Sequence, residues 1–357
     1  MTGYRSSAAP SRPRRSLHLG TPAVHEFSSA DGVRLRLTRY RGGERGPVML
    51  THGLGVSSLI FTIDTIEPNL TEYLYARGFD VWLLDSRASI DLASASTQFT
   101  ADEIANQDYP AAVAAVREVT ASPTVQIVAH CFGSTTFAMA MLAGLQGVRA
   151  AVCSQVATHL LAPPVMEIKC GLHVPELLEV LGVPSLTAYV DDRATWHERL
   201  FDLAVGLWPD GGSQGCDSPV CRRITFMYGP LYQHDQLTPA THDALPEMFG
   251  VANVHALDHL ARMVRTGHVC AADGTDAYLP NLDRLAIPIA FIHGSENRCF
   301  LPKSTELTYA LLRERVGERL CRRHVIPGYG HIDCIFGRNA ATDVYPLIVD
   351  HLSTADA

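Results

Sequence analysis

The residue best suited to covalent chemistry in this sequence is Cys131, in the segment "VQIVAHCFGSTT" from Val125 to Thr136. An apolar run typical of a buried strand ends there in a turn of small residues and continues as a helix-like run. The thiol is therefore expected at a helix N-terminus, where unpaired N–H groups and the helix dipole lower the pKa of a cysteine. Such a thiolate attacks acyl groups. The alternative is a small buried side chain without chemistry.

Length and composition limit the kind of protein this can be. The chain has 357 residues, more than a single core usually supports, so we expect one main domain with a large insertion. The formal net charge of -8 argues against a nucleic-acid-binding surface. No apolar run reaches the ~18 residues of a membrane span, and the N-terminus lacks the apolar segment of a secretory signal. These features predict a cytoplasmic protein without a membrane span.

The sequence contains nine scattered cysteines, most of which are expected to be free in a reducing compartment. Cys216 and Cys221, in "CDSPVC", could close a small loop or bind a metal together with distant partners. No second close pair accompanies them, so neither a metal site nor a cofactor is predicted. Whether these two cysteines are paired stays open.

The elements that must position Cys131 follow an alternating pattern. Strands are expected at 33–40, 47–53, 80–85, 124–129, 148–155 and 287–294, with a last strand and loop at 322–331. Helices are expected at 101–119, 134–145, 304–316 and 342–352. Continuously apolar strands that alternate with helices predict an α/β fold with a mostly parallel sheet covered on both faces.

The alternation is interrupted between 157 and 285, a stretch with several Pro and Gly residues and scattered amphipathic segments. We predict that 157–285 is a mainly helical cap, inserted between the two parts of the core at 25–156 and 286–357. Residues 1–24, which are rich in Ser, Pro and Arg, are expected to form a disordered or extended tail.

Four motifs in the chain resemble those of α/β-hydrolases, over roughly residue 24 to the C-terminus. "LTHGLG" resembles the oxyanion loop, "AHCFGS" the nucleophile elbow (usually G-x-S-x-G), "FIHGSEN" the strand end with the acid, and "GYGHIDCIFG" the histidine loop. "GHID", "DVWLLDSRAS" and "DYPAAVAAV" are similar to the acid (gastric-type) lipase subgroup. "HGLGVSS", "AHCFGS" and "HGSENRCFLPKST" together look most like the hydrolase-like domain fused to some GMC (cholesterol-oxidase-like) flavoenzymes. No dinucleotide-binding G-x-G-x-x-G precedes them here.

The resemblance implies an α/β-hydrolase fold with a catalytic triad of Cys131, His331 and Glu296. Cys131 is the expected nucleophile, and His331 is expected to take the thiol proton and deliver it to the leaving group or acceptor. Glu296 is expected to hold the tautomer of His331 and stabilise the imidazolium. Asp333 and Asp85 are the alternatives for the acid.

The same resemblance predicts the surroundings of the nucleophile. The oxyanion hole is expected to consist of the backbone N–H groups of Leu54 and Phe132. Ile60 and Phe61, just past the oxyanion loop, are expected to face the substrate. Aromatic and methionine residues in the cap predict an apolar acyl or ring-bearing ligand.

These expectations lead to a cysteine-dependent hydrolase that acts on a small-molecule ester or thioester of an apolar acyl group. The first alternative is an acyltransferase or condensing enzyme, because a thioester at Cys131 in a dry pocket could pass its acyl group to an amine, alcohol or thiol acceptor. The second alternative is a non-catalytic binding domain that kept the fold, although the presence of all four motifs argues against it. The sequence predicts no oligomeric state.

Overall fold

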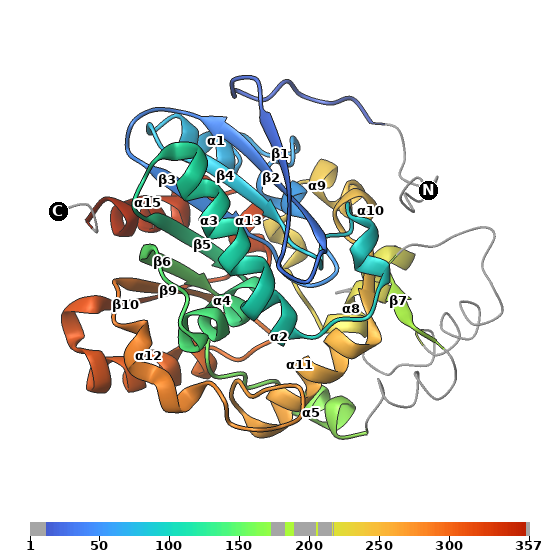
Figure 1. The fold of residues 1–357 in the computed structure, drawn as a ribbon. Helices are drawn as coiled ribbons and strands as arrows, with labels where there is room; N and C mark the ends of the chain where they lie inside the picture. Colours follow the sequence, from blue (N-terminus) through green and yellow to red (C-terminus); the bar gives the residue numbers. More distant parts are fainter. Residues whose placement is uncertain (1–11, 173–182, 189–204, 206–215, 217, 355–357) are drawn as a thin grey trace.

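The computed structural model describes residues 12–172, 183–188, 205, 216 and 218–354. A central sheet of eight strands forms the core, in the order β1-β2-β4-β3-β5-β6-β9-β10 (Figure 1). β1 and β2 pair antiparallel, as do β2 and β4, and the other pairs are parallel. The predicted mostly parallel sheet is thus confirmed. The strands are β1 (Ala23–Ser28), β2 (Arg34–Arg41), β3 (Pro47–Thr51), β4 (Asp80–Asp85), β5 (Val125–His130), β6 (Val148–Ser154), β9 (Ile289–Gly294) and β10 (Cys321–Ile326).

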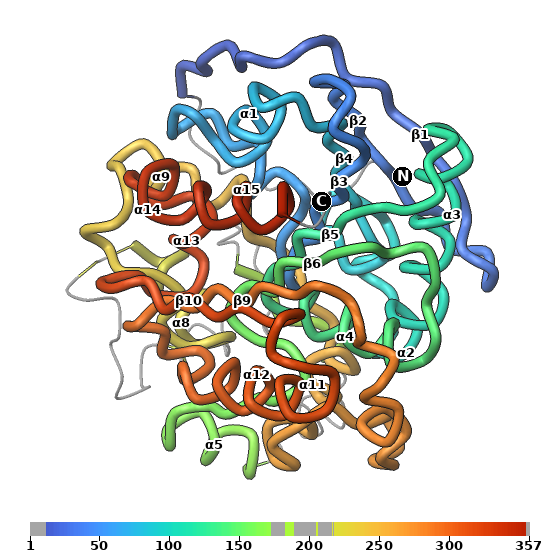
Figure 2. The backbone as a smooth tube through the Cα atoms, turned by 90° about the vertical axis from the view of Figure 1, so that its left-hand side faces the viewer, coloured from blue at the N-terminus to red at the C-terminus, as the bar shows by residue number. Residues whose placement is uncertain are grey.

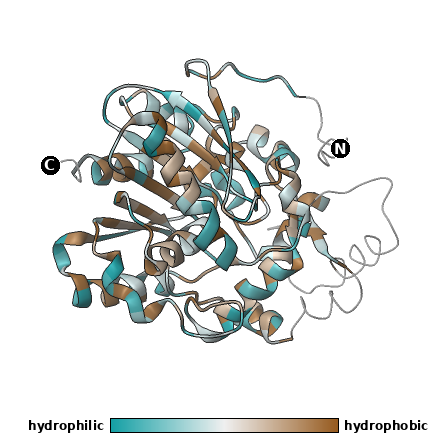
Figure 3. Cartoon of the chain, viewed as in Figure 1, coloured by the Kyte–Doolittle hydropathy of each residue, from teal (hydrophilic) through white to brown (hydrophobic). Residues whose placement is uncertain are grey.

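The central strands are continuously apolar because helices cover both faces of the sheet. Every residue of β3, β4, β5 and β9 is buried, and these strands stand out as apolar in Figure 3. In the view of Figure 2, α1 and α15 lie on one side of the sheet, and α4 and α12 lie on the other. The core helices are α1 (Leu70–Tyr75), α2 (Ala101–Glu103), α3 (Tyr109–Thr120), α4 (Phe132–Ala143), α12 (Lys303–Val316), α13 (Asp333–Phe336), α14 (Ala340–Asp343) and α15 (Tyr345–Thr354). Shorter turns are η1 (Ser58–Phe61), η2 (Ala93–Ser96), the π-helical η3 (Ile104–Asp108) and η6 (Glu318–Leu320).

The segment predicted as a cap is mostly helical in its described parts. It also contains a two-stranded antiparallel sheet, β7 with β8, which the sequence analysis did not anticipate. A backbone bridge between Val56 and Phe249 connects this segment to the loop after β3. The elements are α5 (Pro164–Gly171), β7 (Ser185–Thr187), α8 (Pro219–Tyr228), η4 (His234–Gln236), α9 (Pro239–Asp243), α10 (Leu245–Met248), β8 (Val251–Asn253), α11 (Val254–Thr266) and η5 (Leu279–Leu285).

Part of the predicted N-terminal tail lies against the core. Residues 12–22 contain neither helix nor strand, in line with an extended segment, and residues 1–11 lie outside the described part. The Arg12 guanidinium donates to Asp64 at 3.0 Å and to Glu247 at 2.8 Å, so that it bridges the core and the cap. No helix among the described residues is both long and apolar enough to traverse a bilayer.

Candidate active site

Cys131 occupies a sharp turn between β5 and α4. Its backbone angles are φ 58° and ψ -127°, in the left-handed region that residues with a Cβ rarely adopt. Strain of this kind concentrates at functional sites. The turn also requires glycine at position 133, because a Cβ there would lie 2.4 Å from the carbonyl oxygen of His52. The sequence thus provides a glycine where the start of α4 packs against the backbone that follows β3.

The sulfur of Cys131 faces two backbone N–H groups. Burial raises the pKa of the Cys131 thiol to about 12, although the N–H groups of Phe132 and Leu54 donate to the sulfur and lower it. These are the two groups predicted for the oxyanion hole, and the structure brings them to one point. The expected net lowering of the Cys131 pKa is wrong, because the loss of solvent outweighs the helix N-terminus.

His331 lies on the loop after β10 and is almost fully buried. Its Nδ1 lies 3.0 Å from Nδ2 of Asn297, and its Nε2 has no hydrogen-bond partner among the described residues. The His331 and His130 rings stack edge to face with their centroids 5.0 Å apart. Burial, together with the neighbouring His130 and His293, holds the pKa of His331 well below its usual value. The ring is therefore neutral at physiological pH.

Glu296 is not placed as predicted for the triad acid. Its side chain is exposed, and its carboxylate accepts a hydrogen bond from the Ser295 hydroxyl at 3.2 Å. The next residue, Asn297, is buried and contacts His331 instead. The physical reason is the turn after β9, which directs residue 296 to solvent and residue 297 into the site.

Two backbone groups fix the orientation of the Asn297 amide. Its Oδ1 accepts from the N–H groups of Cys299 at 2.9 Å and Phe300 at 3.0 Å. Its Nδ2 therefore faces both His331 and Oε1 of Gln155, at 3.0 Å each. The Gln155 oxygen is itself fixed, because it also accepts from the N–H of Gly294 at 3.0 Å. A reversed Asn297 amide would place its NH₂ group against two N–H donors.

This network determines where the proton of neutral His331 resides. An NH₂ group facing Nδ1 requires that Nδ1 accept, so the ring proton lies on Nε2. Asn297 is also uncharged and cannot stabilise an imidazolium as a carboxylate does. The resting site thus combines a neutral thiol with a neutral imidazole.

The two alternative acids are engaged elsewhere. Asp333 accepts from the N–H groups of Gly330 at 2.9 Å and Gln233 at 3.2 Å, which ties the histidine loop to the cap, and burial raises its pKa to about 7. Asp85 accepts from the N–H of Ser58 and the hydroxyl of Ser89. Both carboxylates thus organise loops around the site.

An apolar cavity, open in part to solvent, lies next to the loop that holds Asn297. Cys299 and Phe300 form part of its wall, and their N–H groups hold Asn297, so the wall and the His331 site share one loop. Ile60 and Phe61, predicted to face the substrate, are instead completely buried in η1, and neither lines this cavity. The lining residues are Ala162, Met166, Lys169, Cys170, Leu186, Phe226, Met227, Tyr228, Leu257, Leu260, Ala261, Val264, Cys299 and Phe300.

The chain is similar to known proteins over most of its length. The model of the alpha/beta hydrolase family matches residues 48–345. Human lipase member K is 22% identical over 390 aligned residues, which cover 98% of this chain and 94% of the relative. Human gastric triacylglycerol lipase is 23% identical, with 92% of this chain and 87% of the relative covered.

Solved structures show the same fold. The DcsB complex with its substrate analogue has a TM-score of 0.60 at 15% identity and covers 94% of this chain and 100% of that one. An esterase from Thermogutta terrifontis has a TM-score of 0.56 at 13% identity, with the same coverage of the two chains. The predicted fold and the hydrolase class are thereby confirmed: the chain belongs to the alpha/beta hydrolase family.

Proposed function

We propose that the protein cleaves esters or thioesters of an apolar acyl group through an acyl intermediate on Cys131, with Asn297 holding the ring of His331 in its neutral form. One observation carries this proposal: Cys131 stands in a left-handed turn with its sulfur facing the N–H groups of Leu54 and Phe132. The carbonyl oxygen of a substrate bound at the same place would accept hydrogen bonds from both N–H groups. These bonds would strengthen as negative charge develops on the oxygen during attack. Each donor of this kind is typically worth ~2.7–4 kcal/mol of barrier.

The Asn297–His331 contact narrows the class of leaving group. A carboxylate partner would let His331 become an imidazolium and then protonate an alkoxide. With an amide partner the imidazolium is unfavourable, so the site is poorly equipped to protonate a leaving group. Thiolates and phenolates depart without prior protonation, whereas alkoxides do not. We therefore expect thioesters and aryl esters to be the substrates.

The thiol nucleophile fits the same logic. A cysteine depends less on a general base than a serine does, because sulfur is intrinsically more nucleophilic than a hydroxyl oxygen. The Cys131 thiol first loses its proton to water. The resulting thiolate attacks the carbonyl carbon, forms the S–C bond of the acyl-enzyme and expels the leaving thiolate or phenolate, so that no proton passes through His331.

The acyl group has a suitable place to bind. The cavity wall contains Phe226, Met227 and Tyr228 from α8, and Cys299 and Phe300 from the loop that holds Asn297. Burial lowers the pKa of Lys169, the charged residue in this wall, to about 8. An apolar chain or ring bound in this cavity would be stabilised by roughly 25 cal/mol for each Å² of apolar surface that it buries.

Transfer of the acyl group to an acceptor is the second candidate, and the Asn297 contact supports it. Water needs a base to attack a thioester, and His331 with its proton on Nε2 is a poor one. Amines and thiols attack thioesters with less assistance. An acceptor substrate would then compete well with water at acyl-Cys131.

A comparison of leaving groups tests the proposed function. One apolar acyl group is presented as a thioester, an aryl ester and an alkyl ester, and kcat/KM is measured with and without amine and thiol acceptors, while intact mass spectrometry follows acylation. We expect the first two donors to acylate wild type faster than the alkyl ester does, and none of the three to acylate Cys131→Ala. Equal turnover of the alkyl ester would contradict the proposed role of Asn297, and activity retained by Cys131→Ala would remove the proposed nucleophile.

A further inference from the structure

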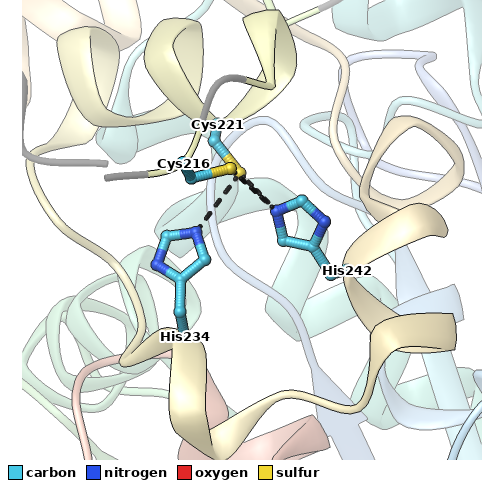
Figure 4. Close-up of side chains that lie close together, drawn as sticks. All are labelled: Cys216, Cys221, His234 and His242. Carbon is cyan, nitrogen blue, oxygen red and sulfur yellow. Dashed lines mark hydrogen bonds between the residues drawn. The ribbon is translucent and has the colours of Figure 1, made fainter. Parts of the chain in front are cut away.

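A second cluster of chemically reactive side chains lies in the cap. Cys216, Cys221, His234 and His242 point toward one another, with one ligand atom from each within 4.8 Å of all the others (Figure 4). Nε2 of His242 lies 3.3 Å from the Cys216 sulfur and 3.0 Å from the Cys221 sulfur. Nε2 of His234 lies 3.7 Å from the Cys221 sulfur.

These distances match the edges of a metal-centred tetrahedron. With Zn–S bonds of about 2.3 Å and Zn–N bonds of about 2.05 Å, tetrahedral geometry places sulfur and nitrogen about 3.5 Å apart. The three S···N distances in the cluster lie on both sides of this value. A set of two thiolates and two imidazoles is characteristic of structural zinc sites.

The groups around the cluster suit a metal with thiolate ligands. The Tyr232 hydroxyl donates to the Cys221 sulfur at 3.0 Å, and the N–H of Ser218 donates to the Cys216 sulfur at 3.4 Å. Such donors stabilise negative charge on ligating sulfur. Nε2 of His242 faces both sulfurs and is the ligand atom, while Nδ1 lies on the side of the Asp243 carboxylate, 3.9 Å away.

We propose that Cys216, Cys221, His234 and His242 bind one zinc ion as a structural site of the cap. Four protein ligands complete the coordination shell, so the ion has no open position for substrate. The sequence gives no second close pair of ligands to indicate this site, because the two histidines come from separate turns, η4 and α9.

The site holds together the part of the cap that borders the catalytic residues. Cys221 lies in the first turns of α8, whose last three residues, Phe226, Met227 and Tyr228, line the apolar cavity. Between α8 and His234, the carbonyl oxygen of Leu231 accepts from the N–H groups of His331 and Ile332 at 2.9 and 2.8 Å. Zinc would therefore stabilise both the cavity wall and the backbone that carries His331.

Metal analysis of the full chain tests the proposal. Protein is expressed with added zinc, purified under reducing conditions and analysed by elemental mass spectrometry; reconstitution with cobalt(II) then reports the coordination by visible absorption. We expect one zinc per chain, intense d–d bands typical of tetrahedral cobalt with thiolate charge transfer, and a Tm lower by ~5 °C or more after chelation. None of these readouts depends on the proposed enzymatic activity.

Variants locate the metal. Cys216→Ser and His242→Ala should each lose most of the bound zinc, while Cys321→Ser, which changes a cysteine on β10, should keep it. If a variant does not fold, the cobalt spectrum of wild type still shows whether a tetrahedral site with thiolate ligands is present. Wild type that binds no zinc, zinc that persists in both site variants, or a Cys216–Cys221 disulfide found by mass spectrometry in the reduced preparation would each overturn the proposal.

Discussion

The NH₂ group of Asn297 faces Nδ1 of His331 at 3.0 Å, in the place where a triad acid was expected. Because the Asn297 oxygen is held by the N–H groups of Cys299 and Phe300, the amide cannot simply turn over to offer an acceptor. Exchanging the amide for a carboxylate would therefore change the protonation of His331. This relationship distinguishes the site from one built around a general base.

The first prediction concerns the tautomer of His331. In wild type, ¹⁵N-detected histidine spectra should show a neutral ring with the proton on Nε2. In Asn297→Asp the proton should move to Nδ1 and the pKa of His331 should rise, because a carboxylate stabilises the imidazolium. Asn281→Asp, in η5, where the amide donates to the carbonyl oxygen of Ala277 and not to a histidine, serves as the matched control and should leave the His331 signals unchanged. A wild-type ring protonated on Nδ1 would show that the Asn297 amide is reversed.

The second prediction concerns the pH dependence of Cys131. Only the thiolate reacts with iodoacetamide, and burial raises the Cys131 pKa to about 12, so the reactive fraction is small at neutral pH and grows with pH. The alkylation rate, followed by peptide mass spectrometry, should rise steadily from pH 7 to 10. A plateau that begins at acidic pH would instead reveal a thiolate–imidazolium pair, in conflict with the neutral state described above.

Much of the fold could be predicted because it depends on patterns visible in single segments. Continuously apolar strands reflect burial on both faces of the sheet. The small-residue turn at Cys131 reflects close approach of the backbone. Each of these features can be recognised in a short stretch of sequence. The convergence of the Leu54 and Phe132 N–H groups on the Cys131 sulfur follows from the same turn and from the loop after β3. The short strand β1, whose residues are mostly exposed, gives no such signal.

The features that the sequence did not predict depend on contacts between distant segments. Asn297 is oriented by the backbone of residues 299 and 300 and by Gln155, which lies more than a hundred residues earlier. The histidines of the cap cluster come from separate turns. The elevated pKa of Cys131 reflects the atoms that the folded chain packs around the thiol, and spacing in the sequence does not report this packing.

The third prediction is the loss of activity in Cys131→Ser. A serine hydroxyl requires a strong general base, and His331 with its proton on Nε2 cannot supply one, so kcat/KM on an aryl ester should fall by ~10²-fold or more. Cys321→Ser makes the same chemical change on β10, away from the turn, and should retain wild-type activity. If Cys131→Ser were as active as wild type, the proposed dependence on sulfur would be refuted.

The fourth prediction tests the close approach at the turn. A methyl group at Gly133 would lie 2.4 Å from the carbonyl oxygen of His52 and 3.0 Å from that of Thr51, and both of these atoms belong to backbone that cannot easily move. Gly133→Ala should therefore lower Tm by ~5 °C or more, or abolish folding, because the loop after β3 must shift away from α4. Gly171→Ala, at the end of α5 where a Cβ meets no atom within 4 Å, should leave Tm unchanged or slightly raised. Thermal unfolding followed by circular dichroism compares the two variants, and equal Tm values would mean that α4 and the loop after β3 are farther apart than the structure places them.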